Sequence, residues 1–365
     1  MAGLGETIER LVRARRDHAL RASPPRPARM KPIADFGDNP GALRMWLYAP
    51  PDLGRRPPLV VVVHGCGQRA EAFASDGGWL ALARRLGFAV LAPEQGMLNN
   101  LNVCFNWFAP DDVTRGQGEA ASIAAMVAHA VGLLGLDPER VFVTGLSAGG
   151  AMAAALLATY PELFAGGAII AGIPYGVARS LQDGLKIMQR GDGRSRRDLG
   201  ALAREAGPRD FRRPLRLSIW QGEADMVVNP VNGRALADQW TEALGLPLAP
   251  DEEIVLPRRR RLVWRGAAGV ESVVELNLIA DLGHGAPLST LKAGDVGAPA
   301  PFMLEAGISS TLEVAGFWGL GAEAAAEPPV KVSAEPAAVA RADHGLLGRL
   351  RRAVVGAIRA IGLKR

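Results

Sequence analysis

Short apolar runs alternate with longer helix-like stretches along most of the chain. The run LVVVV at 59–63 and the segment VFVTG at 141–145 show almost no polar alternation, which is typical of strands buried on both faces. We expect strands at 45–50, 58–65, 88–94, 140–145, 165–172, 215–222 and 270–283, and helices at 78–87, 118–135, 148–160, 177–206, 231–245 and 306–318. This order predicts an α/β fold with a mostly parallel sheet that is covered by helices on both faces. Polar residues that follow the carboxyl ends of such strands are the candidates for chemistry.

The two ends of the chain differ from its middle. Residues 1–31 are expected to form a basic helix followed by a proline-rich linker, and residues 32–321 a single catalytic domain. Residues 322–344 form an Ala/Pro-rich linker that is too poor in large apolar residues to pack, so we expect it to be disordered. Residues 345–365 are expected to form a basic amphipathic helix that contacts a membrane surface, a polymer granule or another partner, or that is simply solvated.

Composition and charge argue against several classes of protein. The chain has 365 residues, of which 48% are hydrophobic, and its apolar runs stop far short of the roughly 20 residues that a membrane span needs. Arg and Glu interrupt every apolar stretch near the N-terminus, so no secretory signal is recognised and a cytoplasmic location is favoured. The net charge of +5 arises at the ends, because residues 1–31 carry +5, residues 322–365 carry +4 and residues 32–321 carry −4. A nucleic-acid partner is not expected, since such proteins concentrate basic charge at the binding groove.

The chain has two cysteines, Cys66 and Cys104. Neither has a Cys or His neighbour at the spacing of zinc ligands, so we expect no metal. A disulfide between them requires that both lie on neighbouring loops. In a chain without a recognised signal, free thiols are the commoner state, and we expect them here.

The segment VFVTGLSAGGAM predicts a nucleophile at Ser147. It contains the pattern Gly-x-Ser-x-Gly between a strand and a helix, where small residues allow the strand and the helix to approach each other. In a chain with 44 glycines the same pattern also arises as an ordinary turn. The preceding strand and the following helix favour a nucleophile elbow, whose helix N-terminus points N–H groups at developing negative charge.

An elbow serine needs an acid and then a histidine further along the chain. Asp225 follows the strand at 215–222, and His284 follows the strand at 270–283, so both fall at carboxyl strand ends. His284 is expected to accept the proton of Ser147, and Asp225 to fix the tautomer of His284. Glu223 and Asp281 are alternative acids, and Asp281 lies so close to His284 in sequence that it more plausibly shapes the loop.

The remaining histidines are weaker candidates for the base. His18 and His344 lie in the tails, and His129 lies within a predicted helix. His64, in the segment HGCG, is expected to be a neighbour of the site, but it precedes the serine and so breaks the expected order.

An oxyanion hole needs two backbone donors. The elbow itself supplies the N–H of Ala148. The second donor is expected from the loop at Gly65, Cys66 and Gly67, which equally reads as a plain tight turn.

Four stretches together resemble the polyhydroxybutyrate depolymerase-type esterases of the α/β-hydrolase superfamily. They are VVVVHGCGQ, NVCFNWFAPDDVTRGQGEAASIAAMV, VFVTGLSAGGAM and IWQGEADMVVNPVNG. The resemblance covers about 45–320 and implies an α/β-hydrolase fold, hydrolysis of esters by a serine, and an oxyanion-hole contribution from the N–H of Cys66. It also implies short poly(3-hydroxyalkanoate), feruloyl or acetyl esters as substrates.

The chain departs from the family after His284, where many members carry a tryptophan-containing loop and this chain has GHGAPLST. This difference leaves the substrate open, and the lack of a visible polymer-binding domain favours soluble or short-chain esters. Trp107 and Phe108 are expected either to line the acyl site or to pack in the core.

The sequence therefore predicts a serine carboxylic ester hydrolase that forms an acyl-enzyme on Ser147 and needs no cofactor. An acyltransferase on the same scaffold and a non-catalytic binding protein are the alternatives. The oligomeric state stays open.

Overall fold

The computed structural model describes residues 30–208, 213–266 and 273–321. The chain divides into a unit Met1–Gly321 and a unit Ala322–Arg365. The described residues leave out nearly all of 1–31, the linker at 322–344 and the tail at 345–365. What the sequence predicts for these segments therefore stays a prediction.

One large sheet organises the described part of the chain, in which ten strands follow the order β1-β2-β4-β3-β5-β6-β7-β10-β9-β8. The strands are β1 (Lys31–Ile33), β2 (Arg44–Tyr48), β3 (Leu59–Val63), β4 (Ala89–Glu94), β5 (Val141–Leu146), β6 (Gly166–Ile170), β7 (Arg216–Gly222), β8 (Glu252–Leu256), β9 (Arg259–Arg265) and β10 (Val273–Ile279). The six strands from β4 to β10 in this order are parallel, and the pairs at both edges are antiparallel. The predicted mostly parallel sheet is confirmed.

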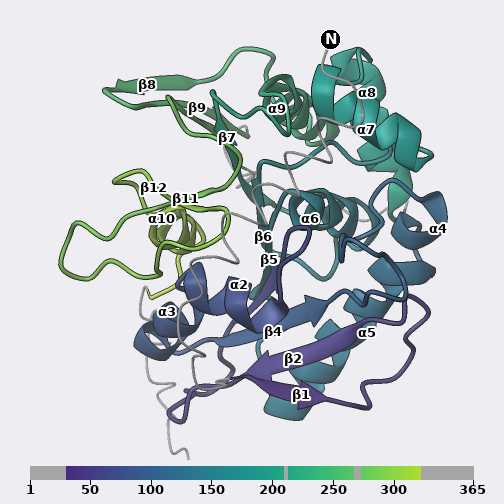
Figure 1. The fold of residues 1–365 in the computed structure, drawn as a ribbon, viewed down its shortest axis with the longest axis vertical. Coiled ribbons are helices and arrows are strands. Elements are labelled where there is room, and N and C mark those ends of the chain that lie inside the picture. Colours follow the sequence, from purple (N-terminus) through teal and green to yellow (C-terminus); the bar gives the residue numbers. More distant parts are fainter. Residues whose placement is uncertain (1–29, 209–212, 267–272, 322–365) are drawn as a thin grey trace, which may run out of the picture. The chain divides into compact units, whose positions relative to one another are not determined.

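Helices cover both faces of the sheet. In the described residues they are α2 (Ala70–Asp76), α3 (Trp79–Leu86), α4 (Pro110–Val113), α5 (Gly118–Leu134), α6 (Ala148–Thr159), α7 (Leu181–Arg190), α8 (Arg196–Ala206), α9 (Val231–Ala243) and α10 (Ser310–Phe317). Leu59, Val61 and Val63 of β3 share one core cluster with residues of α5, α6 and α9. Val60 and Val62 face the other way, into a cluster with α2, α3 and α10. Figure 1 shows α2, α3 and α10 on one side of the sheet and α5 on the other. The continuous apolar run thus fills two cores at once.

The structure differs from the sequence prediction at the far edge of the sheet. The hairpin of β8 and β9 was not predicted, because its sequence EEIVLPRRRRLVWR is dominated by charge and contains a proline. The charges are paired across the hairpin, where Arg260 contacts Glu253 at 2.6 Å and Arg265 contacts Glu252 at 3.0 Å. A second, two-stranded sheet of β11 (Ala286–Leu288) and β12 (Met303–Glu305) was also too short to be predicted.

The polar stretch expected at 177–206 consists of two helices, α7 and α8, that pack against α9. Gln239 of α9 is buried and bonds to the backbone of Tyr175 and Leu199. Asn232 of the same helix donates to the carbonyl oxygens of Ile187 and Met188 at 3.0 and 3.3 Å. These bonds tie the segment to the body of the domain.

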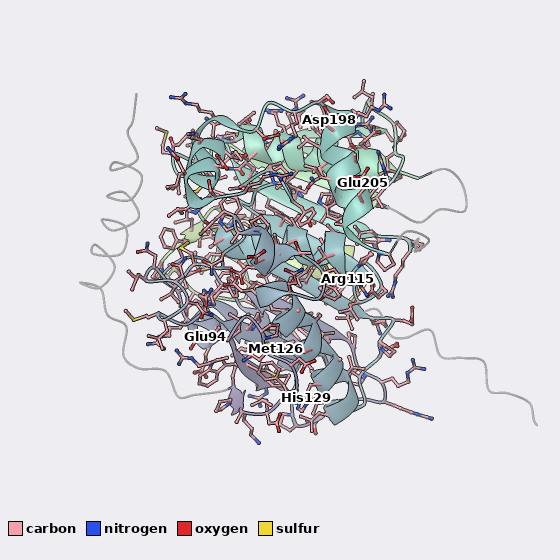
Figure 2. All side chains as sticks on the ribbon, turned by 90° about the vertical axis from the view of Figure 1, so that its right-hand side faces the viewer. Glu94, Arg115, Met126, His129, Asp198 and Glu205 are labelled. Carbon is pink, nitrogen blue, oxygen red and sulfur yellow. A yellow bond between two sulfur atoms is a disulfide. The ribbon has the colours of Figure 1, made fainter. Side chains whose placement is uncertain are left out.

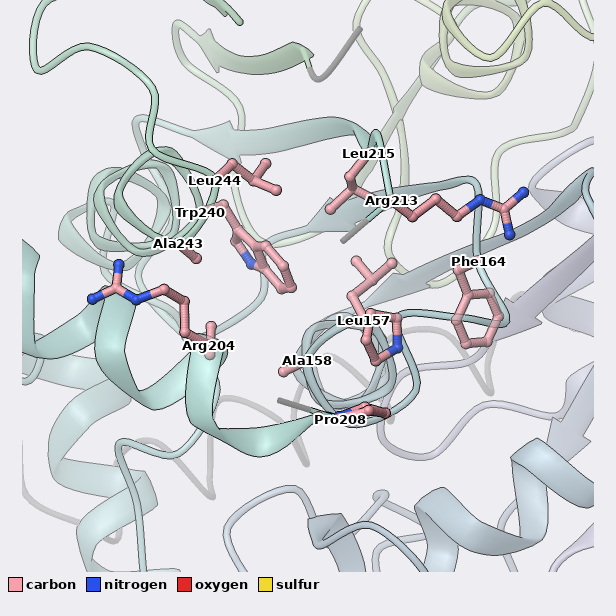
Figure 3. A pocket seen from close by; sticks show the side chains of 13 residues that line it. Leu157, Ala158, Phe164, Arg204, Pro208, Arg213, Leu215, Trp240, Ala243 and Leu244 are labelled. Carbon is pink, nitrogen blue, oxygen red and sulfur yellow. The ribbon is translucent and has the colours of Figure 1, made fainter. Parts of the chain in front are cut away.

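A cavity of about 80 Å³ lies between α6, α8, α9 and the start of β7 (Figure 3). It is lined by Leu157, Ala158, Pro161, Phe164, Ala203, Arg204, Gly207, Pro208, Arg213, Leu215, Trp240, Ala243 and Leu244. None of the predicted site residues lines it. We regard it as a feature of helix packing at the end of the sheet away from the candidate site. In the described part of the chain, no helix is both long and apolar enough to cross a membrane.

Trp318 fixes the C-terminal end of the domain to the sheet. Its ring stacks on Phe142 of β5 at 4.9 Å and on Trp79 of α3 at 5.9 Å, and it is 5% exposed.

We expect Trp318→Ala to lower the free energy of unfolding by about 3 to 5 kcal/mol, because a large cavity opens between α3 and β5. Chemical denaturation measures this value. Leu98→Ala, at a fully exposed position, is the control and should change stability by less than about 0.5 kcal/mol. Equal free energies of unfolding for the two variants would contradict the packing role of Trp318.

Candidate active site

Ser147 occupies the tight turn between β5 and α6. Its backbone has φ 57° and ψ −118°, a conformation that residues with a side chain rarely adopt. Its N–H donates to the carbonyl oxygen of Ile170 on the neighbouring strand at 2.9 Å. The structure therefore places Ser147 on a strained strand-to-helix turn, as the sequence predicts.

The two glycines of the motif make this turn sterically feasible. A Cβ atom at Gly149 would lie 2.1 Å from the carbonyl oxygen of Val63, and a Cβ atom at Gly145 would lie 2.2 Å from the carbonyl oxygen of Gly149. No side chain fits at such distances. The elbow therefore requires glycine at both positions.

Asp225 and His284 are in direct contact, with Asp225 Oδ2 2.8 Å from His284 Nδ1. The other carboxylate oxygen of Asp225 accepts the backbone N–H groups of Val227 and Val228 at 2.8 and 2.9 Å. Gln221 Nε2 donates to Oδ2 at 3.2 Å. A carboxylate with this many donors accepts the hydrogen bond from Nδ1–H, which leaves Nε2 of His284 available as a base.

The backbone explains why these two residues meet. β7 and β10 are paired in parallel, so the loops after their carboxyl ends lie side by side. A Cβ atom at Gly222 would lie only 2.2 Å from the carbonyl oxygen of Leu282. The loop that carries His284 therefore packs directly on the start of the loop that carries Asp225.

A chain of contacts also joins the serine side of the site to the histidine side. A Cβ atom at Gly65 would lie 3.7 Å from Cβ of Ser147, so this loop borders the elbow. Gln68 accepts the N–H of Gly65 at 2.8 Å and donates to the carbonyl oxygen of Pro301 at 3.0 Å. The next residue, Phe302, packs edge-on against the His284 ring at 5.8 Å.

Two backbone N–H groups remain available near Ser147. Ala148 is the first residue of α6, so its N–H has no acceptor within the helix. In the loop after β3, the N–H of Gly65 donates to Gln68 Oε1, and the N–H of Gly67 donates to the carbonyl oxygen of Asn102. The N–H of Gln68 donates to the carbonyl oxygen of Gly65. Of these four described loop residues, only Cys66 has an N–H without an acceptor. This pattern fits the predicted pair of donors at Cys66 and Ala148.

Cys66 and Cys104 form a disulfide, so the expectation of free thiols is wrong. Their Cα atoms are 4.2 Å apart, although 38 positions separate them in the sequence. The reason is the pairing of β3 with β4, because the loops that follow these parallel strands lie side by side. The N–H of Gly67 donates to the carbonyl oxygen of Asn102 at 2.9 Å, which adds a second tie between the loops.

The aromatic pair Trp107 and Phe108 lies under α7. A Cβ atom at Gly184 of that helix would lie 2.9 Å from the Trp107 ring. Both side chains are half-buried and pack edge-on against each other at 5.7 Å. Core packing thus accounts for part of each ring, and their contact with substrate stays a prediction.

The alternative acids and bases do not meet the pair. Glu223 is exposed and faces Arg234 at 3.8 Å. Asp281 is exposed, with φ 58°, and so shapes its loop as expected. His129 is half-buried on the outer helix α5 (Figure 2). His18 and His344 lie outside the described residues.

Sequence reasoning missed a buried polar network beside the site. His64, Gln95 and Glu119 are at most 1% exposed and are joined by hydrogen bonds. A glutamine and a glutamate in loop and helix segments carry no pattern that predicts burial. Among the described residues, no group of His, Cys, Asp or Glu side chains is arranged to hold a metal ion.

The sheet topology, the two helical layers and the loops at the carboxyl ends of the strands define an α/β-hydrolase fold. An acetyl xylan esterase from Aspergillus awamori has a similar fold, with a TM-score of 0.67 over 80% of this chain and all of that chain at 23% sequence identity. The predicted fold class is confirmed.

The chain belongs to the esterase PHB depolymerase family. The family model with that description matches residues 43–249. Poly(3-hydroxyalkanoate) depolymerase C of Paucimonas lemoignei is 38% identical over 290 residues, which are 79% of this chain and 69% of that protein. Feruloyl esterase B of Thermothelomyces thermophilus is 29% identical over 247 residues, which are 66% of this chain and 84% of that protein. The resemblance inferred from the four motifs is confirmed, and with it the class of ester hydrolase.

The elbow geometry gives a matched pair of glycine substitutions. We expect Gly149→Ala to abolish ester hydrolysis and to lower the melting temperature, because its methyl group collides with the carbonyl oxygens of Val63 and His64. Gly132→Ala, in the last turn of α5 with no atom within 4 Å of the added Cβ, should instead stabilise the fold by up to about 1 kcal/mol and leave activity unchanged. Thermal unfolding and an ester assay measure both. An active, stable Gly149→Ala variant would contradict the close approach.

The disulfide predicts a specific response to reductant. Denatured protein without reductant should show no free thiol, and reduction should lower esterase activity because the loop at Cys66 loses its tie to Cys104. A double variant with alanine at both positions should already be less active and should not respond to reductant. Free thiols in the unreduced protein would contradict this prediction. So would a loss of activity on adding reductant that is as large in the double variant as in wild type.

Proposed function

We propose that the protein hydrolyses carboxylic esters through an acyl-enzyme on Ser147. Ser147 Oγ attacks the carbonyl carbon of the ester while Nε2 of His284 accepts its proton. The bond from the carbonyl carbon to the alkoxy oxygen then breaks, and the imidazolium returns the proton to the leaving alcohol. Water attacks the acyl-enzyme with the same base, so that Ser147 recovers its proton and the acid is released.

The surrounding groups support this sequence of steps. The buried carboxylate of Asp225 favours the imidazolium that forms on His284. The N–H groups of Cys66 and Ala148 would donate hydrogen bonds to the carbonyl oxygen as it becomes negatively charged, and the N-terminus of α6 adds its dipole. The observation that carries the proposal is the Asp225–His284 hydrogen bond at the same sheet edge as the strained Ser147.

We infer that the acyl group is an aliphatic hydroxy acid, as in short 3-hydroxyalkanoate esters, with feruloyl and acetyl esters as the alternatives. The relative named as a poly(3-hydroxyalkanoate) depolymerase is 38% identical, against 29% for a feruloyl esterase and 32% for an acetylxylan esterase of Aspergillus oryzae. Exposed apolar side chains at Met97, Leu98 and Leu101, in the loop after β4, offer contacts to an aliphatic chain. Rates on 3-hydroxybutyrate oligomers, methyl ferulate and acetylated xylan would rank the three classes.

The disulfide also bears on where the protein works. Disulfides persist in oxidising compartments and are rare in the cytosol. We therefore infer an oxidising environment rather than the cytoplasm that the sequence favours.

A fluorophosphonate probe tests the nucleophile. Wild-type protein should bind it in a one-to-one ratio at Ser147, and Ser147→Ala should bind none and lose activity. Asp225→Asn should lose about 10⁴-fold in kcat with the fold retained, because His284 then takes the wrong tautomer. Glu223→Gln is the matched control on the same loop and should keep wild-type activity. Esterase activity in Ser147→Ala would refute the proposal.

A further inference from the structure

Glu119 is a buried carboxyl group that the proposed chemistry does not use. It lies in the first turn of α5 and is 0% exposed. Within the described ranges, no Lys, Arg or His side chain forms an ion pair with it. Its two oxygens instead accept hydrogen bonds from the backbone N–H of Asn106, at 2.8 Å, and from the side-chain amide of Gln95. Burying a carboxyl group is costly unless hydrogen bonds replace its contacts with water, so these two donors are needed to keep Glu119 inside the fold.

The hydrogen bonds of Glu119 continue toward Ser147. The side-chain amide of Gln95 also donates to the carbonyl oxygen of Cys104 at 3.1 Å, and the backbone N–H of Gln95 donates to Nε2 of His64 at 3.1 Å. Nδ1 of His64 lies 2.8 Å from the carbonyl oxygen of Gly65. Because Nε2 accepts, Nδ1 carries the proton and donates to that carbonyl. Phe105 covers the His64 ring at 4.9 Å.

The last bond in this chain determines the direction of one particular peptide group. The carbonyl of Gly65 and the N–H of Cys66 belong to the same planar, trans peptide, so they point in opposite directions. When His64 holds the carbonyl oxygen, it also aims the N–H of Cys66. Burial lowers the pKa of His64 to about 4, so the ring stays neutral and keeps this tautomer at ordinary working pH.

The same carboxyl group supports the other side of the loop. Gln95 holds the carbonyl of Cys104, Glu119 holds the N–H of Asn106, and the disulfide joins Cys104 to Cys66. The peptide between Gly65 and Cys66 is therefore fixed both through His64 and through the disulfide, and both supports end on Glu119.

We propose that Glu119 is a positioning residue that, through Gln95 and His64, aims the N–H of Cys66 at the oxyanion, and that its ionisation changes the rate of ester hydrolysis. The proposal rests on the proposed function of Ser147. An ionised carboxylate accepts both N–H donors fully, whereas the acid form must turn one oxygen into a donor. The rate should therefore rise when Glu119 ionises.

The charged groups around Glu119 set the pH at which this happens. Burial, and then the charge of Asp112 on α4, raise the pKa of Glu119 to about 8. The pKa of Asp112 is itself raised by burial and by Asp111. Three arginines of the described residues pair with other carboxylates: Arg115 contacts Glu162 at 2.6 Å, and Arg44 and Arg69 face Glu94 at 3.5 and 3.6 Å. Arg115 and Glu94 are labelled in Figure 2.

Stability should change in the opposite direction to the rate. The folded pKa of about 8 lies above the ordinary value of 4.5, so the stability from this group is complete below about pH 4.5 and is lost as the pH rises to about 8. Rising pH thus ionises Glu119, weakens the fold and tightens the bonds to Gln95 and Asn106.

The test compares Glu119→Ala and Glu119→Gln with wild type between about pH 6.5 and 9.5 on a p-nitrophenyl ester. Rates are expressed per site that reacts with the fluorophosphonate, so that unfolded protein is not counted. Glu119→Ala should lose about tenfold or more in kcat, with KM within about twofold, because the oxyanion donor is misplaced. Glu119→Gln keeps the size but, like the acid form of Glu119, offers one acceptor and one donor, so its kcat should stay at the value that wild type shows at the acidic end of this pH range. It should lack both the rise in kcat near pH 8 and the matching decline in melting temperature.

Glu275→Gln is the matched control. Glu275 is equally buried, in β10, where it accepts from Ser218 and pairs with Arg261 at 2.5 Å. The control should lower the melting temperature but keep kcat per labelled site and the rise near pH 8. Wild-type kcat per site in Glu119→Ala, or a retained rise in Glu119→Gln, overturns the proposal. If Glu119→Ala does not fold, the pH profile of Glu119→Gln decides alone. Absence of the label in wild type would instead contradict the function proposed for Ser147.

Discussion

The close approach of three backbone segments at Gly145 and Gly149 is the constraint on which the site depends. Carbonyl oxygens lie 2.1 and 2.2 Å from where side chains would begin, so only glycine at both positions allows α6 to pack this closely against β5 and the end of β3. In this packing Ser147 has a φ of 57°, and the loop after β3 lies beside it. The positions of the proposed nucleophile, of one proposed oxyanion donor and of the loop that carries the other all follow from this single packing arrangement.

The parallel order of the sheet then brings together groups that are far apart in the sequence. β5, β6, β7 and β10 are neighbours, so the loops with Ser147, Asp225 and His284 all leave the same edge. Asp225 accepts four hydrogen bonds, one of them from Nδ1 of His284. This bond orients the imidazole ring, so that its Nε2 remains available as the proposed base. Gln68 completes the arrangement by linking Gly65 to the loop that covers His284.

Local sequence was sufficient for the parts of the structure that have a strong local signal. The unbroken apolar run of β3 and the glycines of the elbow predicted the central strands, the fold class and Ser147, and strand ends predicted where Asp225 and His284 would lie. Pairing between distant segments was not predictable in the same way. The Cys66–Cys104 bond depends on the adjacency of β3 and β4, and the hairpin of β8 and β9 depends on cross-strand charge pairs. The burial of Glu119 depends on its two partners Gln95 and Asn106. Each of these needs the tertiary structure, because composition alone assigns charged residues to the surface.

In the proposed mechanism, Ser147 carries the acyl group during turnover. Acid quenching of the enzyme during hydrolysis of a 3-hydroxybutyrate ester, followed by proteolysis and mass spectrometry, tests it most directly. We expect a mass increase equal to one acyl group on the peptide that contains Ser147 in wild type, and none on the corresponding peptide of Ser147→Ala. Continued hydrolysis with the acyl group on another peptide and none on the Ser147 peptide would contradict this mechanism.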